Sequence, residues 1–200
     1  MTNPITLLRQ GLLALMLAGA SLGAMAAPIY YHVDLDTTLA GSTSGVISFQ
    51  FAAIGAPAPL TATVSNFTGA TNGQAPTSEV AIDANGNFVI ANDFSYADVA
   101  AMFGGLFSFD VAFSGDLAGV NGSDSSTLVV SLLDENLNTL LGDGLFGVVR
   151  FEILPVVGAV PVDALAGVVG VTAVPEPGNL ALMLMGIAML GFTVRRKMRG

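Results

Sequence analysis

Apolar and polar residues alternate in a series of short runs along the middle of this 200-residue chain. In the first run Tyr31, Val33 and Leu35 are apolar, and His32 and Asp34 between them are polar. Successive side chains of a β-strand point to opposite faces, so a period of two predicts strands with one buried face. The predicted strands are residues 29–36, 46–51, 60–65, 80–82, 88–90, 107–114, 126–133, 138–141 and 145–154, with residues 168–174 as a further candidate.

Residues typical of turns separate these runs. Asn85-Gly86 is the strongest short hairpin signal in the chain. Only residues 96–103 are predicted to be helical, with Asp93 or Ser95 as the N-cap and Gly104-Gly105 as the stop signal. Eight or nine short strands in about 145 residues predict an all-β domain, an antiparallel β-sandwich with jelly-roll or Greek-key connections.

The length and composition allow one such domain, which we place at residues 27–173. The chain has no Cys, which excludes a disulfide scaffold, a thiolate metal site and a thiol nucleophile. Residues 53–59 and 68–78 are predicted to be loose loops, and residues 155–161 a connection inside the domain.

The charged residues are unevenly distributed. The whole chain has 15 acidic and 6 basic residues, for a formal net charge of −9. Between residues 27 and 175 there are 14 acidic residues and one basic residue, Arg150, which gives −13. A segment with this much negative charge repels phosphate groups, which argues against nucleic acid and anionic membrane surfaces as partners.

Residues 1–26 have the features of a secretory signal peptide. Arg9 is the positive residue, residues 11–23 are small and apolar, and Ala24 and Ala26 are the small residues that signal peptidase requires. We expect signal peptidase to cut before Ala27, and the alternative is an uncleaved N-terminal anchor.

The C-terminal segment, residues 174–200, has three parts in a fixed order. Residues 174–179 include Pro175, Glu176 and Pro177, and an uncharged apolar run follows at residues 180–194. A basic tail at residues 195–200 then contains Arg195, Arg196, Lys197 and Arg199. Fifteen helical residues rise about 22 Å against a hydrocarbon core of about 30 Å, so this predicted transmembrane helix is a weak anchor. The positive-inside rule places the basic tail in the cytoplasm and the domain outside.

This arrangement resembles the PEP-CTERM sorting signal of Gram-negative bacteria, whose partner is the membrane enzyme exosortase. The resemblance implies that Pro175, Glu176 and Pro177 are the recognised motif and that the helix lies only transiently in the inner membrane. It also implies delivery to the outer surface or extracellular matrix, commonly in species that make exopolysaccharide. The run from Tyr31 to Thr37 resembles, more loosely, the first strand of small PEP-CTERM proteins without an assigned activity. The alternative is a permanent single-pass tail.

Candidate catalytic residues are few. The chain has one His, and Thr43 stands where the Gly-x-Ser-x-Gly motif of hydrolases has its serine. Asp110 and Asp116 flank the end of a predicted strand and are the candidate pair for glycoside hydrolysis, although the chain lacks Trp. We therefore predict no catalytic residues and no enzymatic activity.

Candidate ligand-binding residues have simpler explanations. His32, Asp34 and Asp36 share one face of a strand and could bind a metal ion or a sugar, but an exposed polar face is the commoner cause of such alternation. Residues 83–87 and 134–138 offer oxygen ligands for Ca²⁺, but turns favour Asp, Asn and Gly for backbone reasons. We predict no metal site and no cofactor, with Ca²⁺ as the exception left open.

These observations predict an exported structural or adhesive protein of the cell surface or matrix, associated with exopolysaccharide or a biofilm. Its expected partners are signal peptidase, exosortase, the inner membrane transiently, and exopolysaccharide. The alternative is a surface module that binds polysaccharide like a lectin, with or without Ca²⁺.

Overall fold

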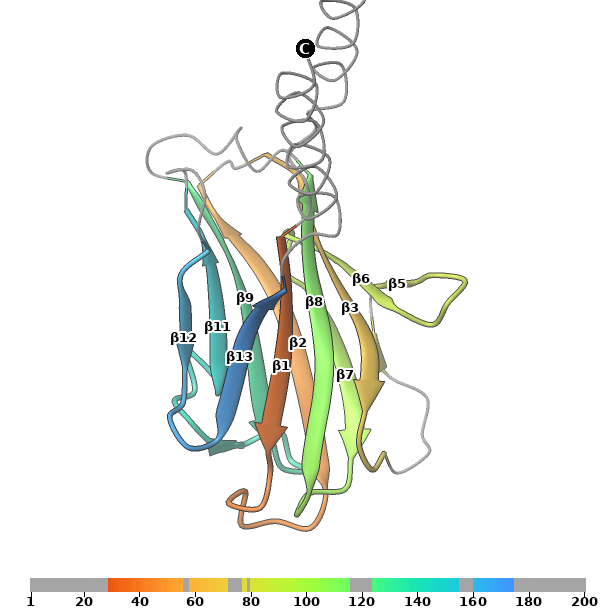
Figure 1. Ribbon diagram of the computed structural model, residues 1–200, viewed down its shortest axis with the longest axis vertical. Coiled ribbons are helices and arrows are strands. Elements are labelled where there is room, and N and C mark those ends of the chain that lie inside the picture. The colour runs from red at the N-terminus through yellow and green to blue at the C-terminus, as the bar shows by residue number, and fades with distance from the viewer. Residues whose placement is uncertain are drawn as a thin grey trace, which may run out of the picture.

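The computed structural model describes residues 29–55, 58–71, 77–78, 80–115, 124–154 and 160–174. All regular elements in these ranges are strands, and they form two antiparallel sheets that pack face to face (Figure 1). The all-β class and the sandwich of two sheets are therefore confirmed. No helix among the described residues has the length and apolar character needed to cross a membrane.

The first sheet has six strands. In spatial order they are β13 (Val169–Val174), β1 (Ile29–Asp36), β8 (Leu106–Gly115), β3 (Leu60–Thr68), β6 (Phe88–Ala91) and β5 (Ala81–Ile82). The second sheet has seven. Its order is β12 (Val162–Ala164), β11 (Val149–Ile153), β9 (Ser125–Leu133), β2 (Gly45–Ile54), β7 (Ser95–Ala101) and β4 (Thr77–Ser78), and β10 (Thr139–Leu141) also pairs with β9. Because β1, β2 and β3 already alternate between the sheets, most neighbours in a sheet are distant in the sequence.

Alternate residues of the strands fill the space between the sheets. In β8 the buried side chains are Phe107, Phe109, Val111 and Phe113, as the alternation predicts. Aromatic rings from opposite sheets meet there, with centroids 5.0 Å apart for Phe49 and Phe109. Full burial of one such side chain stabilises the fold by about 1.5–3 kcal/mol, so this aromatic layer holds the two sheets together.

A buried polar side chain holds the connection in which the chain passes from one sheet to the other. Asn92 lies between β6 of the first sheet and β7 of the second, and only 8% of it is exposed. Its side-chain amide donates to Ala58 O at 3.1 Å and Ser126 Oγ at 2.9 Å, and its oxygen accepts from Leu60 N at 3.1 Å. These bonds satisfy the buried amide and tie β3 to β9 across the end of the sandwich.

The predicted helix at residues 96–103 is wrong, because this segment forms β7. Ala97, Val99 and Ala101 are buried on one face of β7, so the segment follows a period of two. Residues 95–101 pair with residues 45–51 of β2 along the whole strand. An isolated helix of this length is marginal in water, and the ladder with β2 offers the same backbone bonds together with burial.

The structure contains more strands than the eight or nine predicted. β4 lies within the predicted loop at residues 68–78, and β12 follows the predicted connection at residues 155–161. Both are edge strands of two or three residues, too short for alternation to show in the sequence. β11 is shorter than the predicted strand at residues 145–154, because a turn closed by the bridge between Asp143 and Gly147 precedes it.

The described part of the domain begins and ends on neighbouring strands. β1 and β13 are antiparallel, and Tyr30, near the start of β1, pairs with Val174, the last residue of β13. The start of the first described strand and the end of the last described strand therefore lie together at one end of the sandwich (Figure 1).

Candidate functional site

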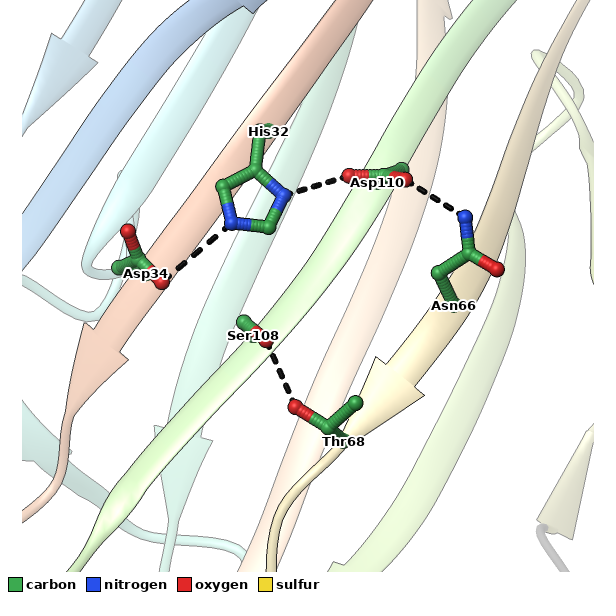
Figure 2. A network of polar contacts seen from close by, with 6 residues as sticks. All are labelled: His32, Asp34, Asn66, Thr68, Ser108 and Asp110. Atoms are coloured by element: carbon green, nitrogen blue, oxygen red, sulfur yellow. Dashed lines mark hydrogen bonds and ion pairs between the residues drawn. The ribbon is translucent and has the colours of Figure 1, made fainter.

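The outer face of the first sheet holds the main cluster of polar side chains, which we call the polar network (Figure 2). Its members are His32 and Asp34 of β1, Ser108 and Asp110 of β8, and Asn66 and Thr68 of β3. The strand register brings them together, because His32 pairs with Asp110 and Asp34 pairs with Ser108. Side chains directly opposite each other in an antiparallel pair lie close enough to bond.

His32 lies between two carboxylates. Its Nδ1 is 2.6 Å from Asp110 Oδ1, and its Nε2 is 3.4 Å from Asp34 Oδ1. The hydrogen bond to Asp110 raises the pKa of His32 above its ordinary value, and the charge of Asp34 adds to this effect. The imidazole side chain is 42% exposed, so water screens the charge of the imidazolium, and each ion pair contributes at most about 1 kcal/mol.

A β-bulge places Asn66 in the polar network. The register of β3 against β8 shifts between Ser65 and Thr68, and Asn66 has a left-handed φ of 51°. The shift turns Asn66 outward, where its Nδ2 donates to Asp110 Oδ2 at 2.7 Å. It turns Phe67 inward against Phe109, with ring centroids 6.1 Å apart. Asn is one of the few residues that adopt this backbone conformation readily.

Asp110 is the centre of the polar network. Burial alone would raise the pKa of its carboxyl group, but the hydrogen bonds from Asn66 and His32 outweigh burial and lower this pKa below its ordinary value. Asp110 is therefore a carboxylate, and the imidazolium form of His32 is the better partner for it.

The polar network lacks the arrangement of a nucleophilic enzyme. Thr68 Oγ1 and Ser108 Oγ bond to each other at 2.6 Å. The partners of the His32 ring are the carboxylates of Asp110 and Asp34, so neither hydroxyl of the polar network is paired with the imidazole. Nor do any three or more His, Asp or Glu side chains of these ranges form a group suited to hold a metal ion.

The structure brings together residues that the sequence offered as separate candidates. His32, Asp34 and Asp36 alternate with the buried residues of β1 and share one face, as predicted. Asp36 is not part of the polar network, and its Oδ1 accepts a hydrogen bond from Thr38 N at 2.9 Å. Asp110 joins His32, whereas its proposed partner Asp116 lies outside the described residues. Sequence reasoning missed Asn66, and the available signal was the pair of adjacent polar residues Ser65-Asn66, which breaks the alternation of β3.

The two candidate Ca²⁺ loops are closed turns. Asp83 Oδ1 accepts from the backbone N–H groups of Asn85 at 2.7 Å and Asn87 at 3.0 Å. Asp134 Oδ1 accepts from Asn136 N and Asn138 N, each at 2.8 Å. The pKa of the Asp83 carboxyl group is lowered, chiefly by the hydrogen bond from the backbone of Asn87. The pKa of the Asp134 carboxyl group is lowered too, chiefly by the hydrogen bond from the side chain of Asn138. Turn geometry therefore accounts for both sequences.

Arg150, the single basic residue between residues 27 and 175, lies beside a shallow pocket. The pocket has a volume of about 380 Å³, and its lining includes Phe146 and Asp163. The Arg150 guanidinium lies 4.3 Å from the centre of the Phe146 ring, and its Nη2 lies 3.6 Å from Asp163 Oδ2. Arg150 thus links β11 to the edge strand β12, with which it pairs at Asp163.

The residues predicted to direct sorting lie outside the described residues. These are Ala24 and Ala26 of the signal peptide, Pro175, Glu176 and Pro177 of the motif, the helix at residues 180–194, and Arg195, Arg196, Lys197 and Arg199.

Comparison with known proteins bears on this C-terminal segment. Residues 173–197 match the family model described as the PEP-CTERM protein-sorting motif, which confirms the resemblance. No curated protein and no solved structure matches the chain.

Proposed function

Because the chain carries a PEP-CTERM protein-sorting motif at residues 173–197, we propose that it is an exported protein that exosortase processes. In this proposal signal peptidase removes residues 1–26, and exosortase cuts near Pro175, Glu176 and Pro177. The mature domain then leaves the inner membrane for the outer surface or the extracellular matrix. The single observation that carries the proposal is the match of the motif next to a folded β domain.

The mature domain has a structural or adhesive role in this proposal, in association with exopolysaccharide or a biofilm, and it is not an enzyme. Two features support a passive role. His32 is paired with carboxylates and not with a nucleophile. The aromatic core between the sheets packs the two layers of the domain against each other, as a structural module requires.

The intact mass of the mature protein tests this function. The protein is recovered from the medium, the outer surface and the cell membranes, both from host cells that contain exosortase and from cells that lack it. We expect a chain from Ala27 to near Pro177 in the first case and a cell-bound chain that retains residues 180–200 in the second. A mass that still includes residues 180–200 in cells with active exosortase would contradict the proposal.

A second candidate function is binding of polysaccharide to the outer face of the first sheet. The observation that favours it is the polar network, in which His32 and Asp34 offer exposed hydrogen-bonding groups on the outer face of the sheet. Calorimetry with the polysaccharide of the host, with and without Ca²⁺, would detect this binding. Heat of binding that is lost in Asp110→Asn supports it, whereas the absence of heat supports the passive role.

A further inference from the structure

The sorting motif and the fold share two residues. The family match begins at residue 173, whereas β13 extends to Val174. Ala173 and Val174 are still paired with Tyr31 and Tyr30 of β1. The residue that follows Val174 in the sequence is Pro175, the first residue of the Pro-Glu-Pro motif. No spacer therefore separates the last residue of the sheet from the motif.

A paired strand is a poor substrate for a protease. Enzymes that bind extended peptides use the backbone groups and alternate side chains of several consecutive residues. A cleft that encloses the chain on both sides cannot hold Ala173 and Val174 while β1 occupies one side of them. Pairing with β1 and binding to the processing enzyme therefore compete for the same residues.

The C-terminal half of β13 is built so that its detachment costs little. β13 is an edge strand whose single sheet neighbour among the described strands is β1. Its residues Thr172, Ala173 and Val174 are all exposed, whereas Val169 and Val171 are partly buried and pack against the core. Opening from Val174 back to Thr172 thus exposes little new apolar surface, and the inner residues keep the strand attached.

We propose that the end of β13, residues 172–174, must separate from β1 before the sorting motif can be processed. This inference rests on the proposed processing by exosortase and adds a conformational step to it. The paired state withholds residues 172–174 from the enzyme, and the open state releases them next to the motif that follows in the sequence. The rate of processing is then set in part by the stability of a few backbone bonds at the edge of the sheet.

A disulfide across the two strands tests the proposal. Because the chain has no Cys of its own, the two introduced cysteines have no other thiol in the chain to pair with. The double variant Tyr30→Cys with Val174→Cys locks the last pair of the ladder, and both positions are exposed. The full-length precursor is expressed in host cells with exosortase, and the amounts of precursor and mature protein are followed by mass and by gel. We expect processing at least tenfold slower than in the wild type, with recovery after reduction of the disulfide.

The matched control locks the same two strands farther from the motif. The double variant Asp34→Cys with Gly170→Cys joins another directly paired couple of β1 and β13. A Cβ atom placed at Gly170 would lie 3.8 Å from Asp34 Cβ, which suits a disulfide. This control should be processed at the rate of the wild type, because residues 172–174 remain free to open.

A second variant separates the strand effect from a general defect in export. Four residues, Gly-Ser-Gly-Ser, inserted between Val174 and Pro175 of the Tyr30→Cys, Val174→Cys chain should restore processing, because the enzyme can then bind the motif without opening β13. Wild-type processing of the oxidised Tyr30→Cys, Val174→Cys precursor would overturn the inference, as would a block that the insertion does not relieve. If the Asp34→Cys, Gly170→Cys control is blocked to the same extent, the inference that only residues 172–174 need to separate from β1 is overturned. If the wild type itself is not processed, the proposed function fails.

Discussion

Leu137 occupies a backbone position that suits glycine better than leucine. The turns after Asp83 and Asp134 have the same hydrogen bonds, and the fourth residue of each has a positive φ, 84° at Gly86 and 63° at Leu137. Leu137 is 62% exposed, so its side chain contributes little packing. We expect Leu137→Gly to raise the free energy of unfolding by about 1 kcal/mol.

Chemical denaturation of the mature domain measures this change. The matched control is Leu145→Gly, since Leu145 is also exposed in a turn but does not have a positive φ. There the substitution only adds freedom to the unfolded chain, so stability should fall slightly. A loss of stability in both variants would contradict the strain at Leu137.

The ion pair of His32 and Asp110 predicts a pH dependence of stability. Because folding raises the pKa of His32, its protonated form stabilises the fold. This contribution is complete below the ordinary histidine pKa of about 6.5 and is lost as pH rises through the folded-state pKa. Because folding lowers the pKa of Asp110, its carboxylate form stabilises the fold at pH values above the ordinary pKa of 3.8. This contribution is lost as pH falls through the folded-state pKa. The two contributions overlap most fully between about pH 5 and pH 6.

The variant Asp110→Asn should therefore cost more stability at pH 5.5 than at pH 8.5. Asp34 lies on the other side of His32, whereas Thr172, which pairs with His32 from β13, does not titrate. Because His32 is partly exposed, the difference between the two pH values should be below about 1 kcal/mol. Urea denaturation at both pH values measures it, and an equal loss at both would argue against the ion pair.

At the scale of elements, the turn before β11 depends on close approach of the backbone. Gly147 has a φ of 63°, and a Cβ atom there would collide with Val130 O and lie 2.8 Å from Ser131 Oγ. Both neighbours belong to β9, against which β11 pairs. Gly147→Ala should destabilise the domain by about 3 kcal/mol, the sum of backbone strain and overpacking.

Gly167→Ala is the control for this prediction. Gly167 has a φ of 79°, but a Cβ atom there would meet no other atom within 4 Å. Gly167→Ala should therefore destabilise the domain only through backbone strain, by about 1 kcal/mol. Thermal unfolding of both variants separates the two effects, and equal losses would show that the approach to β9 is not tight.

The elements that sequence reasoning predicted well are those in which large apolar residues alternate. β1 and β8 have large aliphatic or aromatic residues at every second position, and their inward faces are as expected. The helix predicted at residues 96–103 rests on N-cap and stop signals, and the alternation of β7 is weak because its inward residues include the small side chains Ala97 and Ala101. The contact between His32 and Asp110 depends on which strands are neighbours, and a period of two carries no information on strand order.

At the scale of the whole molecule, the large negative charge between residues 27 and 175 opposes compaction. Screening by salt should therefore raise the melting temperature of the mature domain by a few degrees between about 10 and 150 mM NaCl. At equal ionic strength MgCl₂ and CaCl₂ should have equal effects, because Asp83 and Asp134 are already bonded within their turns. A clearly larger effect of CaCl₂ in thermal scans would indicate a calcium site.

The adjacency of β1 and β13 also determines how the domain responds to tension. A force that pulls its two ends apart acts on Tyr30 and Val174, which are paired at one end of two antiparallel strands. Such a load falls on one backbone bond after another, whereas a pull along the strand axes would be shared by the whole ladder. The domain should yield to weak forces applied through its ends, so a strong mechanical attachment would have to be made through its faces or through the loops at the opposite end of the sandwich.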